Sequence, residues 1–296
     1  MVFLAGLLGA LSEDSQLKSL SPGTAKLAVV EIKGVITSNG GTDVVSGIAG
    51  ASADEITESL ERVCERSDIS AVFLEIDSPG GELTASERVK YAVDDCNKPV
   101  LVYIESVGAS GAYLSALPAD KIVSYETSIV GSIGVISEYL EFSEFLEDYG
   151  VKQVKLFRGR FKGVGDPFSE SSEEDLNYIL GPILDQAYEG FKADVVSYRG
   201  GKLAYTAEPL LSDEIANGAP FTGRKALELG LVDELVTSEK QAKLKAAQLA
   251  GFEDYAEVIT KKKKGWIEGL LESFSEDLST SLLKGFKPLQ ARPSFS

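Results

Sequence analysis

Ser-Ala-Val-Phe-Leu-Glu-Ile-Asp-Ser-Pro-Gly-Gly, residues 70–81, is the stretch that decides the fold of this chain. Residues 70–76 are mostly apolar, which predicts a buried strand. The strand is expected to stop at Asp77-Ser78-Pro79-Gly80-Gly81, because proline and glycine favour a turn. A buried strand that ends in a glycine turn sets the pattern against which the rest of the chain is compared.

Helices and strands alternate on both sides of this stretch. Further strands are expected at 26–32, 99–104, 121–124 and 133–136, and helices at 53–66, 84–95 and 171–199. Strands separated by helices of about ten to fifteen residues predict βαβ units. We therefore expect an α/β fold with a mainly parallel sheet.

The composition is that of a folded, acidic protein. The chain has 296 residues, of which 44% are hydrophobic, and this is enough for a sizeable core. Its formal net charge of −17 argues against nucleic acid as a partner, because phosphates require a basic surface.

Histidine is absent from the chain and cysteine is scarce. Without histidine, the two distant cysteines, Cys64 and Cys96, exclude a zinc site of the ordinary type. Two cysteines are also too few for a disulfide framework, and both fall on expected helices. We therefore interpret them as buried or idle thiols.

Ser110 lies in a run of small residues, Val107-Gly-Ala-Ser-Gly-Ala-Tyr113. Small neighbours let the backbone pass close to a substrate carbonyl, as a nucleophile on a tight turn requires. Because the chain has no histidine, the base for such a serine must be Lys, Asp, Glu, Tyr or the N-terminus. Lysine is the best-attested substitute. A close packing contact between a helix and a strand is the alternative interpretation.

Two glycine turns, residues 77–81 and 106–111, each follow an expected strand. The carboxyl ends of the strands are where open α/β sheets place their sites. Because both turns converge on that edge, chemistry is favoured there over packing alone.

Six short motifs follow one another along the chain from about residue 26 to about residue 236. They are Ile76-Asp-Ser-Pro-Gly-Gly81, Gly108-Ala-Ser-Gly-Ala-Tyr113, Ala119-Asp-Lys-Ile-Val123, Gly131-Ser-Ile-Gly-Val135, Phe161-Lys162 upstream of Pro167-Phe168, and Ala226-Leu-Glu-Leu-Gly-Leu-Val-Asp233. In this order they resemble the motifs of signal peptide peptidases of the short bacterial and archaeal form.

The resemblance implies an α/β fold of the Clp/crotonase-like type, with repeated ββα units and a mainly parallel sheet. It also implies a serine endopeptidase with a Ser-Lys dyad and no cofactor. Members of this family cut hydrophobic peptides that remain in membranes after signal peptides are released. They form homo-oligomeric rings in which neighbouring subunits can complete one site.

The resemblance also assigns roles to individual residues. Ser110 aligns with the nucleophile, Lys162 with the general base, and Ser132 with a serine that orients this lysine. The backbone amides of Gly80 and Gly111 align with the oxyanion hole.

The residues alone leave the choice of lysine open. A lysine acts as a base near neutral pH only where burial or a nearby cation lowers its usual pKa of about 10.4. Arg158 and Arg160 precede Lys162 closely, which is consistent with such a site. Lys152 and Lys155, on an expected strand, are the rival bases.

We expect three segments along the chain. Residues 1–25 form an N-terminal apolar segment or anchor, although their apolar stretch is shorter than the roughly 20 residues that span a bilayer. Residues 26–236 form the peptidase domain. Residues 237–296 form a C-terminal helical extension that contacts either a sister subunit or a membrane surface, with an amphipathic helix over 265–286. The protein is expected to be membrane-associated, with its catalytic body on the extracytoplasmic side.

Other functions compete with the peptidase. A crotonase-like acyl-CoA enzyme would use glutamates as acid and base, and Glu82 and Glu105 lie near the two turns. A phage prohead protease shares the expected core. A catalytically inactive, ring-forming scaffold is the third alternative, but it leaves Ser110, Ser132 and Lys162 without a role.

Overall fold

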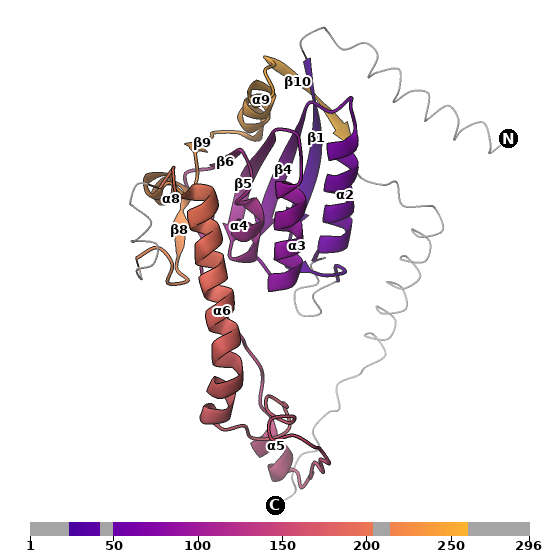
Figure 1. Ribbon diagram of the computed structural model, residues 1–296, viewed down its shortest axis with the longest axis vertical. Coiled ribbons are helices and arrows are strands. Elements are labelled where there is room, and N and C mark those ends of the chain that lie inside the picture. Colours follow the sequence, from indigo (N-terminus) through magenta and orange to yellow (C-terminus); the bar gives the residue numbers. More distant parts are fainter. Residues whose placement is uncertain (1–23, 42–49, 204–213, 260–296) are drawn as a thin grey trace, which may run out of the picture. The chain divides into compact units, whose positions relative to one another are not determined.

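The structure of the chain is a computed structural model, and it describes residues 24–41, 50–203 and 214–259. Its central sheet has the strand order β10-β1-β4-β5-β6-β9, and β7 and β8 extend it beside β5 (Figure 1). The strands are β1 (Thr24–Lys33), β4 (Ala71–Ser78), β5 (Val100–Ala109), β6 (Lys121–Ser124), β7 (Ile129–Gly131), β8 (Pro220–Thr222), β9 (Glu234–Leu235) and β10 (Asp254–Ile259). A separate small sheet pairs β2 (Ile36–Thr37) with β3 (Ala51–Ser52).

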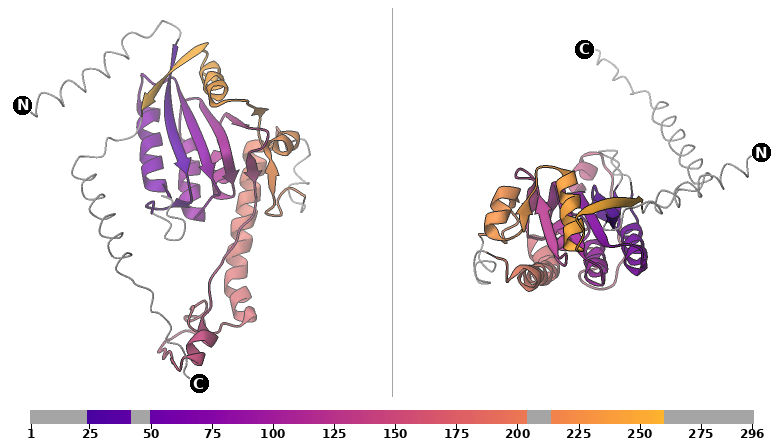
Figure 2. Two further views of the ribbon diagram at one scale, coloured as in Figure 1. Left: turned by 180° about the vertical axis from the view of Figure 1, so that it is seen from behind. Right: turned by 90° about the horizontal axis from the view of Figure 1, so that it is seen from above.

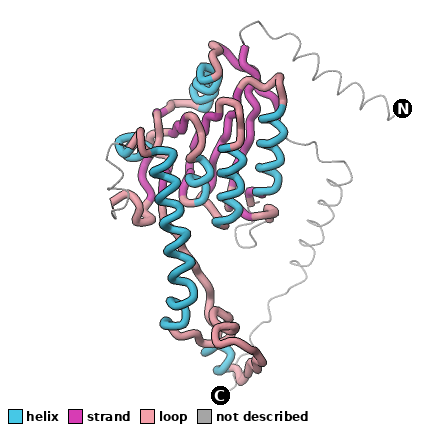
Figure 3. Tube along the Cα trace, in the orientation of Figure 1, coloured by secondary structure: helices cyan, strands magenta, loops and turns pink. Residues whose placement is uncertain are grey.

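The sheet is mainly parallel. Among the described strands, only the pairing of β7 with β8 is antiparallel. Helices follow most of the strands of the central sheet along the chain (Figure 3). They are α2 (Ala53–Glu65), α3 (Leu83–Asp94), α4 (Gly111–Ala116), α5 (Ser143–Asp148), α6 (Glu173–Arg199), α8 (Gly223–Leu229) and α9 (Glu239–Leu249). The α/β class with a mainly parallel sheet is therefore confirmed.

Helices cover both faces of this sheet (Figure 2). Successive strand residues point to opposite faces, so Leu74 and Phe73 of β4 belong to two different cores. The larger core packs Leu74 with residues of α2, α3, α4 and α6. The smaller one packs Phe73 with Ala242 and Ala246 of α9. Both faces of β4 are thus removed from water, which explains its apolar sequence.

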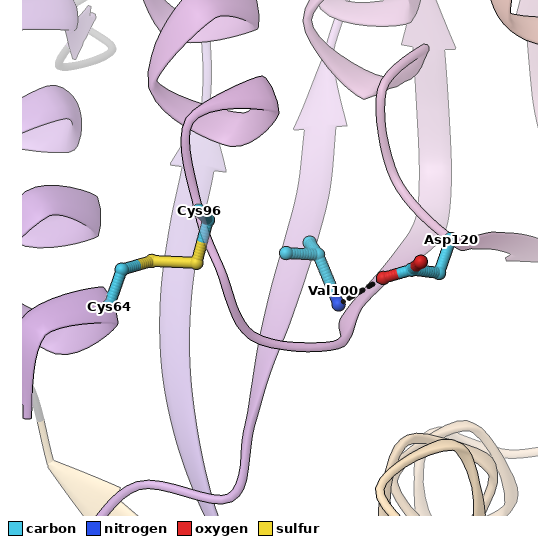
Figure 4. The surroundings of a disulfide bond; sticks show 4 residues. All are labelled: Cys64, Cys96, Val100 and Asp120. Carbon is cyan, nitrogen blue, oxygen red and sulfur yellow. Dashed lines mark hydrogen bonds between the residues drawn. A yellow bond between two sulfur atoms is a disulfide. The ribbon is translucent and has the colours of Figure 1, made fainter. Parts of the chain in front are cut away.

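The two cysteines are joined in a disulfide, so the expectation of idle thiols is wrong. Cys64 lies in the last turn of α2 and Cys96 lies just beyond the end of α3 (Figure 4). The two helices pack side by side on the same face of the sheet, which brings the two Cα atoms to 5.4 Å. That pairing depends on tertiary packing, and the spacing of two cysteines in the sequence does not contain it.

The C-terminal half of α6 is fixed to the sheet and helices by buried polar contacts. The guanidinium of Arg199, whose side chain is 1% exposed, donates to the Gly230 carbonyl at 2.7 Å and pairs with Asp233 at 3.0 Å. Closer to the middle of the helix, Lys90 of α3 pairs with Asp194 at 2.5 Å. The helix continues without interruption through Pro182.

Two expectations about the chain's organisation change. The strand expected at 133–136 is absent, and β7 instead occupies residues 129–131, where it pairs with the end of β5. The C-terminal extension was expected to begin at residue 237, but α9 packs on the sheet and β10 pairs with β1, so the body runs to residue 259. The amphipathic helix expected over 265–286 lies outside the described residues. So do residues 1–23 of the expected apolar segment 1–25.

Within the described ranges, no helix has the length and apolar character needed to cross a bilayer.

Candidate active site

Ser110 is the single residue between β5 and α4. The strand ends at Ala109 and the helix begins at Gly111, so the serine sits on a sharp strand-to-helix turn. Its φ of 52° lies in the left-handed region, which residues other than glycine seldom occupy. Its N–H donates to the Gly131 carbonyl at 2.8 Å, which holds the turn against β7. A strained, half-buried serine of this kind, at the end of a strand, has the geometry of a nucleophile elbow.

The helix that follows Ser110 is held firmly by its neighbours. The Tyr113 hydroxyl donates to the Leu231 carbonyl at 2.8 Å, and burial raises the pKa of this phenol, so it remains a donor. The Ser115 hydroxyl donates to the Ser86 carbonyl of α3 at 3.1 Å. These contacts fix the position of Ser110 from its C-terminal side.

Ser132 lies next to Ser110. Ala109 and Gly131 are partners in the parallel pairing of β5 with β7, so the two serines follow paired residues. Ser132 also has a positive φ, 50°. Its hydroxyl donates to the Gly218 carbonyl at 2.9 Å. Because the hydrogen is engaged there, the oxygen lone pairs remain available to accept a hydrogen bond.

A cleft of about 670 Å³ opens beside the two serines. Its walls come from residues 134–136, from the middle of α6 and from residues 216–218. The lining residues are Ser110, Ser132, Gly134, Val135, Ile136, Leu184, Asp185, Tyr188, Ala216, Asn217 and Gly218. Most of these walls are apolar or uncharged, so an extended apolar peptide is the kind of ligand that the cleft fits.

The expected oxyanion donors are partly rearranged. Gly80 lies against Ser110 as expected, and a Cβ added there would come within 2.7 Å of the Gly111 nitrogen. However, the Gly80 N–H already donates to the Ser78 hydroxyl at 3.1 Å. Among the described residues, the N–H groups of Gly81 and Gly111 have no acceptor, and a Cβ on Gly111 would lie 3.4 Å from the Gly81 nitrogen.

Lys162 does not reach Ser110 within one chain. It is exposed, on a turn that precedes α6. Its neighbour Phe161 stacks on Tyr178 with ring centroids 4.9 Å apart, whereas Tyr188 lines the Ser110 cleft. The two tyrosines are ten positions apart on the helix, which corresponds to about 15 Å along α6. The structure therefore brings Ser110, Ser132, Gly80 and Gly111 together and leaves Lys162 about three helical turns away.

The rival lysines lie in the same part of the chain as Lys162. Lys155 pairs with Asp166 at 2.9 Å, and Lys152 is exposed. The segment 151–156 that carries both is not a strand, contrary to expectation. Lys155 lies beside Lys162, since both line a hollow that Ser110 does not line.

Three other lysines are buried, and sequence reasoning did not single them out. Each is held in an ion pair: Lys90 with Asp194, Lys192 with Glu189, and Lys243 with Glu239 and Glu257. Because each of these side chains is already engaged by a carboxylate, all three are suited to structural roles.

Two further residues of the site were missed. Gly81 follows Gly80 directly, so the motif itself contained the signal for this second donor. Asp185 lines the cleft from the middle of α6, and no pattern in the sequence distinguishes it from the other acidic residues of that helix.

Comparisons with known proteins bear on this site. The family model described as "Peptidase family S49" matches residues 92–253. A protein of Methanocaldococcus jannaschii that bears the name of a protease is 36% identical over 184 residues, covering 62% of this chain and 57% of that protein.

Two bacterial proteins are similar over a longer part of the chain. One from Enterococcus faecium, which bears the name signal peptide peptidase SppA, is 30% identical over 217 residues, covering 72% of this chain and 61% of that protein. One from Synechocystis, also named as a protease, is 32% identical over 213 residues, covering 71% of this chain and 74% of that protein. The resemblance to signal peptide peptidases is thereby confirmed.

The chain spans little more than half the length of the archaeal relative. The family model nevertheless covers more than half of this chain, and the chain covers 74% of the Synechocystis protein. On both grounds, this chain belongs to peptidase family S49.

Proposed function

We propose that this chain is a serine endopeptidase that cuts hydrophobic peptides such as remnant signal peptides, with a Ser-Lys dyad of Ser110 and Lys162. The observation that carries the proposal is the strained turn of Ser110, which opens into a mostly apolar cleft beside Ser132 and two unpaired backbone amides. Membership of a peptidase family supports the class of reaction.

The proposed reaction begins when a neutral lysine takes the proton from the Ser110 hydroxyl. The serine oxygen attacks the peptide carbonyl carbon, and the negative charge moves to the carbonyl oxygen. The N–H groups of Gly111 and Gly81 would hold that oxygen, because both lack another acceptor among the described residues. The lysine then gives its proton to the leaving amine, and water later releases the acyl group from the serine.

Ser132 would orient the lysine. Its hydroxyl hydrogen is engaged by the Gly218 carbonyl, so its oxygen can accept a hydrogen bond from the lysine amine. It would thereby take the place that aspartate has beside histidine in the Ser-His-Asp triad.

We further propose that the lysine comes from a neighbouring copy of the chain. Burial is what makes a lysine a usable base, and Lys162 is exposed and three helical turns from Ser110 in the single chain. The segment around it carries exposed apolar side chains that a second copy would cover. They include Leu140 (66% exposed), Phe145 (59%), Tyr149 (73%), Val154 (83%) and Leu156 (94%).

The test is cleavage of a fluorogenic hydrophobic peptide by wild type, Ser110→Ala and Lys162→Ala between pH 6 and 10, with Lys152→Ala as the matched control. We expect both dyad variants to be inactive, the control to be active, and the wild-type rate to rise with pH as the base loses its proton. Loss of activity in Ser110→Ala alone would retain the nucleophile and exclude Lys162.

Mixing the two inactive variants tests whether the dyad forms between copies. If each site takes serine from one copy and lysine from the next, an equal mixture regains about a quarter of the sites, because a working site needs one particular order of two neighbours. A dyad within one chain gives no recovery. Analytical ultracentrifugation of the mixture checks that the variants have assembled together.

We also propose that the protein is membrane-associated and that its catalytic body faces the extracytoplasmic side. The disulfide between Cys64 and Cys96 supports this, because disulfides persist mainly in oxidising compartments. Alkylation of free thiols at the moment of cell lysis, followed by mass spectrometry, tests whether the catalytic body faces the extracytoplasmic side. Two alkylated cysteines in freshly isolated protein would argue for a reducing compartment.

A further inference from the structure

One charged side chain lines the cleft beside Ser110, among walls that are otherwise apolar or uncharged. It is Asp185, which lies on α6 directly after Leu184 and one turn before Tyr188, both of which line the same cleft. The hydroxyl of Tyr188 donates to the Ala216 carbonyl, which ties this part of α6 to the opposite wall. The position of Asp185 at the cleft is therefore set by a fixed helix.

Unlike the other acidic residues of α6, Asp185 has neither an ion-pair partner among the described residues nor a place in the first helical turn. Asp175, Glu189 and Asp194 are paired with Arg160, Lys192 and Lys90. Glu173 and Glu174 lie in the first helical turn, where the helix dipole stabilises negative charge. Among the described residues, no cation and no hydrogen-bond donor contacts Asp185, which lies in the middle of the helix.

We propose that Asp185 is a specificity-determining residue that selects peptides carrying a lysine or arginine beside an apolar segment. This inference rests on the proposed function, because it takes Ser110 as the nucleophile of the same cleft. The apolar walls accept apolar side chains, and the one unpaired carboxylate favours a cation at their border. A basic residue followed by an apolar run is the arrangement found where the charged and apolar regions of a signal peptide meet.

The expected preference is modest because Asp185 is exposed in the single chain. Ion pairs at such positions change a binding or rate constant by up to about fivefold, and salt screens them. The preference should therefore appear in kcat/KM at low ionic strength and shrink at about 1 M salt.

The test compares pairs of fluorogenic peptides that share one apolar segment and differ by lysine or norleucine at a single flanking position. Norleucine keeps most of the length of the lysine side chain and lacks its charge. With the position scanned along both sides of the cut bond, wild type should prefer lysine about fivefold at one position. Asp185→Asn should bring that ratio to about one. Glu174→Gln, the same charge change three turns earlier on α6, should leave the ratio as it is in wild type.

Each other outcome has a defined meaning. If wild type shows no preference at any position, or Asp185→Asn keeps it, the inference is overturned. If Asp185→Asn lowers kcat/KM equally for both peptides or alters the sedimentation of the oligomer, Asp185 serves assembly, and the inference is again overturned. Failure of the proposed function looks different, because cleavage of both peptides would then persist in Ser110→Ala.

Discussion

Ser110 and Ser132 directly follow residues that pair across two parallel strands, and both adopt a positive φ. The pairing of Ala109 with Gly131 and the 2.8 Å hydrogen bond from Ser110 N–H to the Gly131 carbonyl hold the two turns together. The relative position of the two hydroxyls is therefore set by sheet hydrogen bonds rather than by flexible loops, as pre-organised catalysis requires.

Replacing Ser132 by glycine should separate its hydroxyl from its backbone. Glycine accepts the φ of 50° without strain, so the melting temperature should stay close to that of wild type. Without the hydroxyl the lysine loses its orientation, and kcat should fall about 100-fold. Peptide cleavage measures the fall in kcat, and thermal melting of the same preparation checks that the melting temperature is unchanged. A fully active Ser132→Gly enzyme would show that this hydroxyl does not position the base.

Gly81→Ala should destabilise the protein, because its Cβ would lie 1.9 Å from the Ile36 carbonyl oxygen. Backbone atoms at that distance must move apart, and we expect a loss of about 1–3 kcal/mol in the free energy of unfolding. Gly41→Ala is the matched control, since a Cβ there meets no atom within 4 Å. Urea denaturation of the two variants should distinguish them, and equal midpoints would contradict the close approach of residue 81 to Ile36.

The disulfide should contribute to stability and leave catalysis intact. Closing a loop between Cys64 and Cys96, which are 32 positions apart in the sequence, should stabilise the folded state by about 3–4 kcal/mol. The bond lies at the C-terminal ends of α2 and α3, whereas the turn before α3 faces Ser110. Reduction should therefore lower the urea midpoint without changing kcat at low urea. The double variant Cys64→Ser/Cys96→Ser should show the lower midpoint already and should not respond to reductant.

Stability should fall in acid through the pair of Arg199 and Asp233. Burial alone would raise the pKa of Asp233, but the hydrogen bond and charge of Arg199 outweigh it and hold that pKa below its ordinary value of 3.8. The unfolded chain then binds more protons than the folded one near that pH, so this stabilisation is present above about pH 4 and is lost as the pH falls further.

Asp233→Asn tests this pH dependence. It should lose about 3 kcal/mol at neutral pH, because Arg199 is left buried without its counter-charge. It should also show a shallower decline below pH 4 than wild type in urea titrations. Parallel declines in the two proteins would assign the acid sensitivity to other carboxyl groups.

The sequence predicts those parts of the fold that depend on local patterns. The strand expected at 121–124 matches β6, and the helix expected at 53–66 matches α2 to within one residue, because apolar spacing is visible in the chain itself. The strand expected at 133–136 was misplaced. The position of β7 depends on its pairing with Val107–Ala109, which is a long-range contact. Residues 134–136 line the cleft instead.

The candidate site was predictable to a similar extent. The motifs located Ser110, Ser132 and the glycine turn, because each lies within a few residues of a recognisable pattern. They did not show that the Gly80 N–H donates to the Ser78 hydroxyl, or that Asp185 lines the cleft. They also did not show that about three turns of α6 separate Lys162 from the cleft. These features depend on which distant segments meet in space, and no local pattern contains that information.

The three turns of α6 between Tyr178 and Tyr188 have a consequence for how activity would be controlled. Under the proposed dyad between copies, an isolated chain is latent, and association is the activating step. A newly made copy would need no inhibitory propeptide to be harmless. The specific activity would instead rise with protein concentration and vanish on dilution below the dissociation constant of the assembly.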